Sequence, residues 1–361
     1  MTKAAELAKI GEVLTNSQIG GRRNIAFNGA MQVAQRGTSS TGLGANGDAF
    51  LLDRFRVTAA STAGRYTMTQ TADGPSGFAN CLKIACTTAD TSIAAGENLV
   101  LVQGLEGQDL QQFKKGTSDA EKFTVSFYVK GHDAATYTFE MFDGDNTRQV
   151  SQTFSVTTDW TRVILTFPAD TTGAFGDDNG ASLYLQICLH AGSTFTSGTL
   201  NTSWASNTNA NRYSSDQNSI FESTSATFSI TGFQLEVGSQ ATPFEHRSFA
   251  EELELCKRYF YQLGGQTPFQ NIICAQWISA DTAVAPLYHR PYLRAAPTIA
   301  KLQNYSGLGL GTISQTLTTD QNGPHNTQFG FQGGSGGTSG LNVILRGNNN
   351  SGVYITLDAE L

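Results

Sequence analysis

The sequence predicts a mainly β protein: an antiparallel jelly-roll sandwich with a short N-terminal helix, a linking helix and a second, smaller C-terminal β-domain. Short runs with a period of two residues recur from Asn24 onward, separated by clusters of Gly, Asp and Asn. Glycine is abundant at 38 copies, and charged residues make up only 15% of the 361, a low share for a soluble protein. The length suits a large β-domain with a smaller partner. We therefore divide the chain into a tether at 1–21, a jelly roll at 22–248, a linking helix at 249–262 and a C-terminal β-domain at 263–361.

Residues 1–20 predict a short amphipathic helix. Leu7, Ile10 and Leu14 fall on one helical stripe, and the pair of glycines at 20 and 21 ends the pattern. A helix this short is marginal alone in water, so we expect the stripe to pack on symmetry mates or on another protein. These three residues are the predicted contacts for tethering or trimerisation. The alternative is a frayed tail.

The central strands are predicted from alternation of apolar and polar residues. In KFTVSFYVKG the odd-numbered residues 123–129 are apolar and the even-numbered ones are polar, so one face is expected to meet a core and the other solvent. The same alternation predicts half-buried antiparallel strands in RQVSQTFSV, WTRVILTFP and ASLYLQICLH. In ATFSITGFQLEV the apolar parity switches across Gly232, which predicts a β-bulge there.

A long polar segment and a helix follow the central strands. Residues 191–225 form a connection of unusual length for a compact domain, and such loops are usually functional or mobile. In SFAEELELCKRYFYQL, Ser248 and Glu251 fit a capping box, and Lys257 and Arg258 come late, so we expect a helix of about four turns. FQNIICAQWIS, LNVILRG and VYITLDAEL then predict strands of the second β-domain.

Composition and missing motifs exclude several classes of function. The net charge of −7 with dispersed Lys and Arg argues against nucleic-acid binding. No signal peptide and no apolar run of roughly 18 residues is present, so we expect neither signal-peptide secretion nor membrane insertion. The five cysteines form no CxxC pair and are expected to be reduced thiols. The histidines stand apart, and no nucleophile elbow, Walker loop or dinucleotide fingerprint occurs, so we predict no catalytic residue and no cofactor.

Two acidic turns offer side-chain oxygens that calcium could bind. FDGDNT offers Asp143, Asp145 and Asn146, and FGDDNG offers residues 177–179, all with side-chain oxygens. Neither continues as an EF-hand loop, and Asp-Gly and Asn-Gly pairs are ordinary turn formers. We therefore predict hairpin turns and no bound metal.

Segments at the two ends of the first domain carry a family resemblance. The first is an N-G-A-M-Q-x-x-Q-R-G stretch at 28–37 with a D-R-F turn at 53–55. The second is Q-L-E-x-G at 234–238, A-T-P-F-E at 241–245 and C-x-R-Y-F at 256–260. Together they resemble a family of phage tail-fibre and minor virion structural proteins. Over about residues 22–262 the strands between them are similar in pattern to carbohydrate-binding jelly rolls, and R-A-A-P-T at 294–298 and the terminal LDAEL also match this group.

The resemblance implies a virion component, and the missing catalytic motifs predict that it is not an enzyme. It is expected to be a homotrimeric tail fibre, made in the cytoplasm of the bacterial host, whose N-terminus docks on another tail protein of the virion. Its distal β-domains would bind a receptor on the host surface, a glycan or a protein. Two alternatives stay open: a head, neck or tail decoration protein without receptor binding, and a polysaccharide depolymerase whose paired carboxylates sequence alone does not locate.

The long polar loop supplies the candidate receptor contacts. A glycan site needs an exposed aromatic platform ringed by amides and carboxylates. Within residues 191–225 the candidate side chains are Trp204, Asn207, Asn209, Asn211, Tyr213 and Asp216. Trp204 is flanked by polar residues and belongs to no predicted strand, so we expect it to be exposed. The alternative role for these residues is to anchor the loop or to make trimer contacts.

Overall fold

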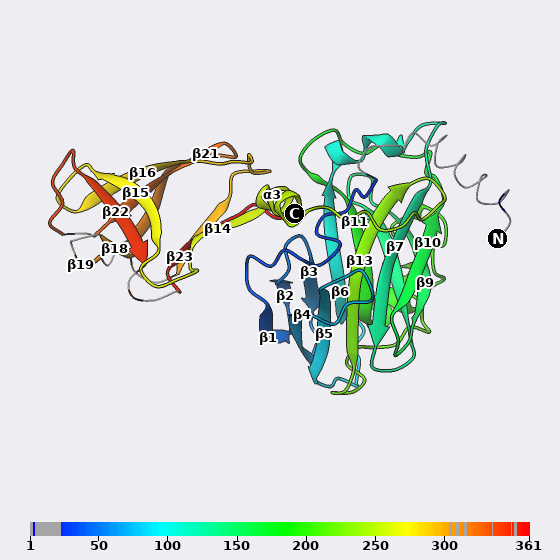
Figure 1. The fold of residues 1–361 in the computed structure, drawn as a ribbon. Helices are drawn as coiled ribbons and strands as arrows, with labels where there is room; N and C mark the ends of the chain where they lie inside the picture. The colour runs from blue at the N-terminus through cyan, green and yellow to red at the C-terminus, as the bar shows by residue number, and fades with distance from the viewer. Residues whose placement is uncertain are drawn as a thin grey trace. The chain divides into compact units, whose positions relative to one another are not determined.

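The computed structural model describes residues 3, 23–302, 305–307, 311–313, 316–333, 335–347, 349 and 352–361. The chain forms two compact units, Met1–Phe249 and Ala250–Leu361 (Figure 1). Every strand pairing recorded in the described residues is antiparallel and helices are few, which confirms the predicted fold class. The predicted tether helix, with Leu7, Ile10 and Leu14, lies outside the described residues. None of the described helices is long and apolar enough to cross a membrane.

Two antiparallel sheets make up the first unit. The six-stranded sheet runs in the order β1 (Ser39–Gly44), β4 (Arg65–Thr71), β5 (Cys81–Thr88), β13 (Thr227–Val237), β7 (Phe123–Gly131) and β10 (Thr161–Phe167). The seven-stranded sheet runs in the order β12 (Ala205–Ser206), β9 (Arg148–Val156), β8 (Ala135–Asp143), β11 (Ala181–Ala191), β6 (Asn98–Glu106), β3 (Arg56–Ala60) and β2 (Gly47–Phe50). Short helical turns lie in the connections: η1 (Gly107–Asp109), η2 (Gln111–Phe113), α2 (Ser193–Thr196) and η3 (Asn209–Asn211).

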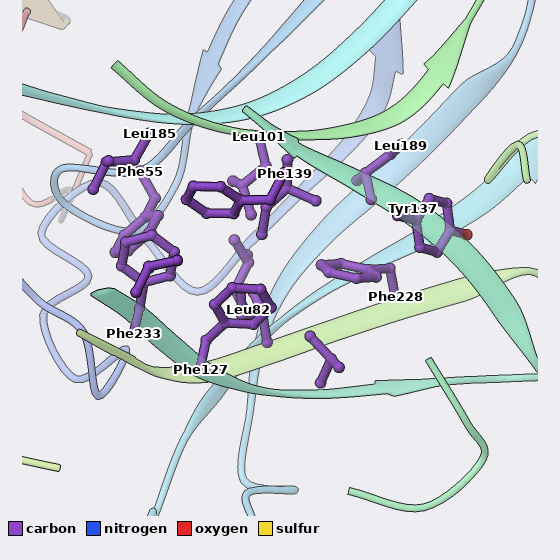
Figure 2. Close-up of a cluster of buried hydrophobic side chains, with 14 of the residues drawn as sticks. Phe55, Leu82, Leu101, Phe127, Tyr137, Phe139, Leu185, Leu189, Phe228 and Phe233 are labelled. Carbon is purple, nitrogen blue, oxygen red and sulfur yellow. The ribbon is translucent and has the colours of Figure 1, made fainter. Parts of the chain in front are cut away.

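The core of the sandwich is filled by aromatic rings from both sheets (Figure 2). Phe127 of β7 lies 5.8 Å from Phe139 of β8 and 5.8 Å from Phe233 of β13, between ring centroids. The apolar residues at 123, 125, 127 and 129 are all fully buried, as the alternation in β7 predicts. The opposite face of this strand is not open to solvent throughout. Thr124 and Ser126 are also buried, and Thr124 donates a hydrogen bond to the carbonyl of Gly238 at 2.7 Å.

The bulge predicted at Gly232 is present in β13. Thr231 pairs with Tyr128 and Gln234 pairs with Ser126, so three steps along β13 oppose two steps along β7. Gly232 has a φ of +63°, a conformation that residues with a side chain rarely adopt. The extra residue explains why the apolar positions of β13 change parity while both halves of the strand still face the core.

The family-like motifs join the start of the first unit to its last strand. Asn24 donates from Nδ2 to the carbonyl of Phe233 at 3.1 Å and accepts at Oδ1 from the amide of Leu235 at 3.1 Å. In the N-G-A-M-Q segment, Asn28 is fully buried and donates to the carbonyl of Asp53 at 2.9 Å. Because these polar groups are buried and satisfied within the fold, the motifs are explained by structure and identify no receptor.

The linking helix is shorter than predicted. Helix α3 covers Phe249–Lys257, whereas the expected helix extends to residue 262. Residues Phe260–Gly264 instead form β14, which pairs with β23 (Tyr354–Asp358) near the other end of the chain. An apolar run of this length fits a helix or a strand equally well. Pairing with β23 makes it a strand.

The second unit contains a three-stranded and a seven-stranded antiparallel sheet. The small sheet has the order β14, β23 and β17 (Thr298–Leu302). The large sheet has the order β19 (Gly311–Ile313), β18 (Tyr305–Gly307), β22 (Asn342–Gly347), β15 (Asn271–Trp277), β16 (Thr282–Tyr288), β21 (Asn326–Gln332) and β20 (Thr316–Asn322). Arg294 of the R-A-A-P-T motif donates to the carbonyls of Ala359 and Glu360 at 2.8 and 3.0 Å. That motif therefore fastens the C-terminal residues.

Candidate functional site

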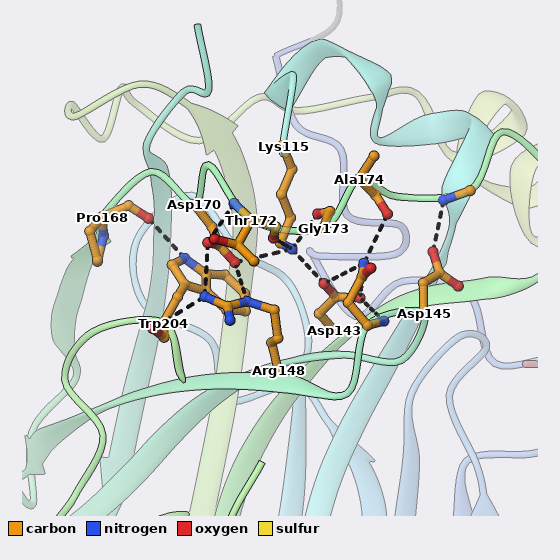
Figure 3. Close-up of polar contacts among 12 residues, drawn as sticks. Lys115, Asp143, Asp145, Arg148, Pro168, Asp170, Thr172, Gly173, Ala174 and Trp204 are labelled. Atoms are coloured by element: carbon orange, nitrogen blue, oxygen red, sulfur yellow. Dashed lines mark hydrogen bonds and ion pairs between the residues drawn. The ribbon is translucent and has the colours of Figure 1, made fainter. Parts of the chain in front are cut away.

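Trp204 anchors the long loop and is not an exposed platform. Its ring is half-buried against the core, 5.7 Å from Phe123 between centroids. Its Nε1 donates to the carbonyl of Pro168 at 2.9 Å, and the Nζ atom of Lys115 lies 5.3 Å from the ring centroid (Figure 3). The expectation of exposure is therefore wrong for this residue, and the alternative of loop anchoring is the one that its contacts support.

The other predicted loop residues separate into two groups. Asn209 in η3 and Asp216 are exposed, and neither lines the cavity on the outer face of the seven-stranded sheet. The half-buried Asn211 accepts a hydrogen bond at its carbonyl from the amide of Asn201 at 3.1 Å. Asn207 is half-buried and Tyr213 is fully buried, and both line that cavity.

The cavity is a groove of about 340 Å³ on the outer face of the seven-stranded sheet. Strand pairing places its walls in register, since Tyr184 of β11 pairs with Phe142 of β8 and Gln186 of β11 pairs with Val102 of β6. Directly paired residues present their side chains on the same face of a sheet. The lining residues are Arg56, Thr58, Asn98, Val100, Val102, Phe142, Tyr184, Gln186, Asn207, Arg212 and Tyr213.

Two aromatic rings and two guanidinium groups form the floor and sides of the groove. The centroids of Tyr184 and Phe142 lie 6.2 Å apart, and both side chains are half-exposed. The guanidinium of Arg56 lies 5.8 Å from the Tyr184 ring, and that of Arg212 lies 5.7 Å from the Phe142 ring. Such cation–π contacts attract each guanidinium to the face of its ring and help to hold the ring in place.

Arg212 connects the long loop to the sheet through a buried carboxylate. Its Nε and Nη2 atoms donate to Glu140 at 3.0 and 2.7 Å, and Nη2 also donates to Oε1 of Gln186 at 3.1 Å. Burial raises the pKa of Glu140, and the charge and hydrogen bonds of Arg212 oppose that change. Because arginine keeps its proton at any physiological pH, the Glu140 carboxylate always has the charged guanidinium of Arg212 beside it.

Two side-chain amide atoms of the groove residues have no hydrogen-bond partner among the described residues. Nε2 of Gln186 makes no hydrogen bond to any described residue, although the Oε1 atom of the same amide is held by Arg212. Oδ1 of Asn207 is buried and also has no partner among the described residues. Buried polar atoms in folded proteins are nearly always hydrogen-bonded, so an oriented donor and an unused acceptor beside aromatic rings suit a polar ligand with an apolar face.

The acidic turn at residues 143–146 is held by a lysine. The fully buried Lys115 places Nζ 2.5 Å from Oδ2 of Asp143 and 3.1 Å from Oδ2 of Asp170 (Figure 3). Asp145 accepts from the amide of Gly176 at 2.8 Å. Residues 143–147 connect β8 to β9 as the predicted hairpin turn. An ammonium group therefore occupies the place between carboxylates that a calcium ion would need.

Arg148 completes this charge cluster. Its Nε donates to Oδ2 of Asp170 at 2.8 Å and its Nη2 donates to Oδ1 at 3.0 Å. Burial acts to raise the pKa of Asp170, but hydrogen bonds from Arg148 and Lys115 outweigh it and lower the pKa below its ordinary value. At the second acidic turn, Asp177 and Asp178 are exposed, so that turn keeps its carboxylates in solvent.

Sequence reasoning overlooked the groove residues that come from strands. In ASLYLQICLH the leucines at 183 and 185 face the core, and the alternating residues Tyr184 and Gln186 lie on the opposite face. An aromatic ring at an outward position next to an outward amide is a signal that the alternation itself contains. Phe142 follows the same pattern in β8, since Phe139 and Met141 face the core and Phe142 lies on the opposite face.

No family model matches the chain, and no curated protein matches it. The family 11 carbohydrate-binding module of a cellulosomal cellulase of Clostridium thermocellum is similar at 10% identity and a TM-score of 0.29, over 56% of this chain and 99% of that one. The N-terminal cellulose-binding domain of Cellulomonas fimi β-1,4-glucanase C is similar at 16% identity and 0.27, over 51% and 90%. The enzymatically active domain of tailspike protein 4 of bacteriophage CBA120 is similar at 11% identity and 0.30, over 59% and 21%. At these scores the likenesses carry no argument about function.

Proposed function

We propose that the first unit binds a carbohydrate in the groove on the outer face of its seven-stranded sheet. The observation that carries this proposal is the combination of the Tyr184 and Phe142 rings with the unused amide atoms of Gln186 and Asn207. A sugar ring has an apolar face that stacks on an aromatic ring and hydroxyl groups that hydrogen-bond to amides. The groove volume of about 340 Å³ is near the lower end of the roughly 300–1,000 Å³ found for ligand pockets. A short stretch of a glycan fits this size.

The lining favours binding over hydrolysis. Glycoside hydrolysis normally uses a pair of carboxyl groups that flank the bond to be broken. Among the described residues that line the groove there is no aspartate or glutamate. The buried carboxylate of Glu140, which lies behind the groove, is held by three hydrogen bonds from Arg212. These features support a receptor or adhesion role ahead of the alternative of a depolymerase.

Binding is tested with the full chain against a panel of soluble bacterial surface polysaccharides in affinity electrophoresis, followed by calorimetry on any polysaccharide that retards the protein. Tyr184→Ala removes the platform, and we expect a 3- to 10-fold loss of affinity, from the roughly 0.5–1.5 kcal/mol of an aromatic contact. Tyr288→Ala is the matched control, because Tyr288 is a 71% exposed tyrosine of the second unit. No binding by the wild type, or equal losses in both variants, would refute the groove.

We further propose that the protein is a trimeric tail fibre of a phage virion, which attaches the particle to its host through this groove. The resemblance of residues 28–37 and 241–245 to phage virion proteins supports this assignment. Light scattering of the purified chain should give three times the monomer mass. Antibody against the chain should block adsorption to the host, and electron microscopy with the same antibody should label the tail. Labelling of the head or neck with normal adsorption would support a decoration protein instead.

A further inference from the structure

A second cluster of buried titratable groups lies at one end of the sandwich, apart from the groove lining. It consists of Asp90 after β5, Glu97 before β6 and His190 near the end of β11. All three residues are buried, with exposed fractions of 6%, 4% and 0%. One nitrogen or oxygen atom from each lies within 4.8 Å of the others, and Nε2 of His190 lies 3.1 Å from Oε2 of Glu97.

The two carboxylates of this cluster have no lysine or arginine to balance them. Among the described residues, Glu97 forms an ion pair only with His190, and Asp90 forms none. Burial lowers the pKa of His190, and the hydrogen bond and charge of Glu97 oppose that change. The Asp143 and Asp170 pair differs, because Lys115 serves both carboxylates. Burying charge without a counter-charge costs several kcal/mol per ion, so the cluster of Asp90, Glu97 and His190 has a missing partner.

The atoms of the cluster are also incompletely used. Asp90 accepts only two backbone amide bonds, from Ala63 at 3.1 Å and Ser92 at 3.3 Å. Oε1 of Glu97 accepts no hydrogen bond from any described residue, although the side chain is 94% buried. Oε1 of Glu97 is therefore available to a further ligand.

We propose that Asp90, Glu97 and His190 bind one divalent transition-metal ion, with Zn²⁺ as the expected occupant. Imidazole with carboxylates is a ligand set that zinc takes readily, and calcium and magnesium prefer oxygen alone. Zinc ligands at roughly 2.0–2.2 Å in tetrahedral geometry stand about 3.4 Å apart, so the cluster has to contract by on the order of 1 Å. The ion replaces the proton between His190 and Glu97.

The surroundings of His190 suit this role. Its Nδ1 lies 2.7 Å from Oγ of Ser219, so a proton on Nδ1 can be donated there and leaves the Nε2 lone pair for the metal. Its ring also packs edge-on against Phe221 at 5.1 Å between centroids. A register shift between Cys188 and His190 marks a bulge in β11 at this point, and bulges commonly re-aim side chains beside functional sites.

The test is a titration of Zn²⁺ alone into the metal-free full chain, by calorimetry and by thermal unfolding. A Cys274→Ser background is used because Cys274 is an exposed thiol, and a free thiolate is itself a zinc ligand that would add a second binding event. We expect one equivalent to bind and the melting temperature to rise by about 5–10 °C at a hundred times the dissociation constant. Glu97→Gln and Asp90→Asn should each weaken binding by at least about 100-fold, since loss of an outer-shell partner alone costs 10- to 100-fold.

His289→Gln is the matched control, because His289 is fully buried but bonds only Tyr261 and Thr327 through its ring. It should bind zinc as the background protein does. Far-UV circular dichroism shows whether each variant folds, and without metal Glu97→Gln should melt no lower than the background, since it removes an unbalanced buried charge. X-ray absorption should show one nitrogen and at least two oxygen neighbours. Absence of zinc uptake, uptake unaffected by both carboxylate variants, or binding of Ca²⁺ alone would overturn the proposal.

Discussion

Lys115→Met is the variant that most directly tests the physical account of the first unit. The Nζ atom of Lys115 is buried and touches Asp143 at 2.5 Å, Asp170 at 3.1 Å and the carbonyls of Thr172 and Gly173 at 3.0 and 2.7 Å. Methionine keeps most of the apolar stem and removes the charge. Asp143 then has no cation partner among the described residues, and Asp170 keeps only the guanidinium of Arg148.

The expected cost is about 3–5 kcal/mol in the free energy of unfolding, the range found when one partner of a buried ion pair is removed. That is a large part of the 5–15 kcal/mol typical of a folded domain. Urea denaturation followed by tryptophan fluorescence measures it, because Trp204 lies beside Lys115. With a denaturant slope of 1–3 kcal/mol/M, the midpoint should fall by at least about 1 M.

Lys114→Met is the control at the neighbouring position. The Lys114 side chain is 53% exposed and pairs with Glu121 at 3.3 Å on the surface. We expect a change within about 0.5 kcal/mol, as for other exposed ion pairs. Adding Asp143→Asn to Lys115→Met should recover part of the lost stability, because it removes one of the stranded charges. If the two lysine variants cost the same, the buried cluster does not stabilise the fold as argued.

Three further results are expected. Trp204→Phe should cost about 1 kcal/mol in chemical denaturation through its lost bond to Pro168, with glycan affinity unchanged. Gly232→Ala should cost at least 1–2 kcal/mol, because its φ of +63° is left-handed and a Cβ atom would lie 2.8 Å from Tyr128. Burial acts to raise the pKa of Asp170, yet its hydrogen bonds lower it, so its stabilising effect is present at neutral pH. Melting temperatures should therefore fall as the pH drops below about 3.9, the ordinary pKa of aspartate.

Much of the first unit could be predicted because its strands bury one face. In β7 the alternation specifies both the strand and the core face, and in β13 the change of parity at Gly232 locates a bulge to the residue. Where both faces are covered, the pattern says less. Thr124 and Ser126 look like surface residues, yet both are buried; Thr124 bonds Gly238 in the segment that follows β13, and Ser126 accepts from Arg162 of β10. Such coverage depends on the path of the chain, which periodicity does not encode.

The end of the linking helix shows a second limit. Phe260–Gly264 continues the apolar pattern of α3, and it becomes a strand because β23 pairs with it about a hundred residues later in the chain. The buried charges show a third limit. Asp143 was weighed as a calcium ligand from its neighbours in sequence, but the group that decides its state is Lys115. Asp90 and Glu97 are likewise far from His190 in sequence, so no local motif joins the three residues.

The long loop at residues 191–225 contributes Asn207, Arg212 and Tyr213 to the lining of the proposed groove, whereas its tryptophan, Trp204, packs against the core. A loop that forms the wall of a groove has to be fixed by buried groups, and Trp204 and the Arg212 pair with Glu140 do this. The stacking platform has different requirements, since a rigid ring is best held by a strand. Tyr184 meets them because its neighbours in β11 are locked in the core. In a β-sandwich of this kind, candidate sugar contacts are therefore better sought among outward-facing aromatic residues of the strands than among aromatic residues of the loops.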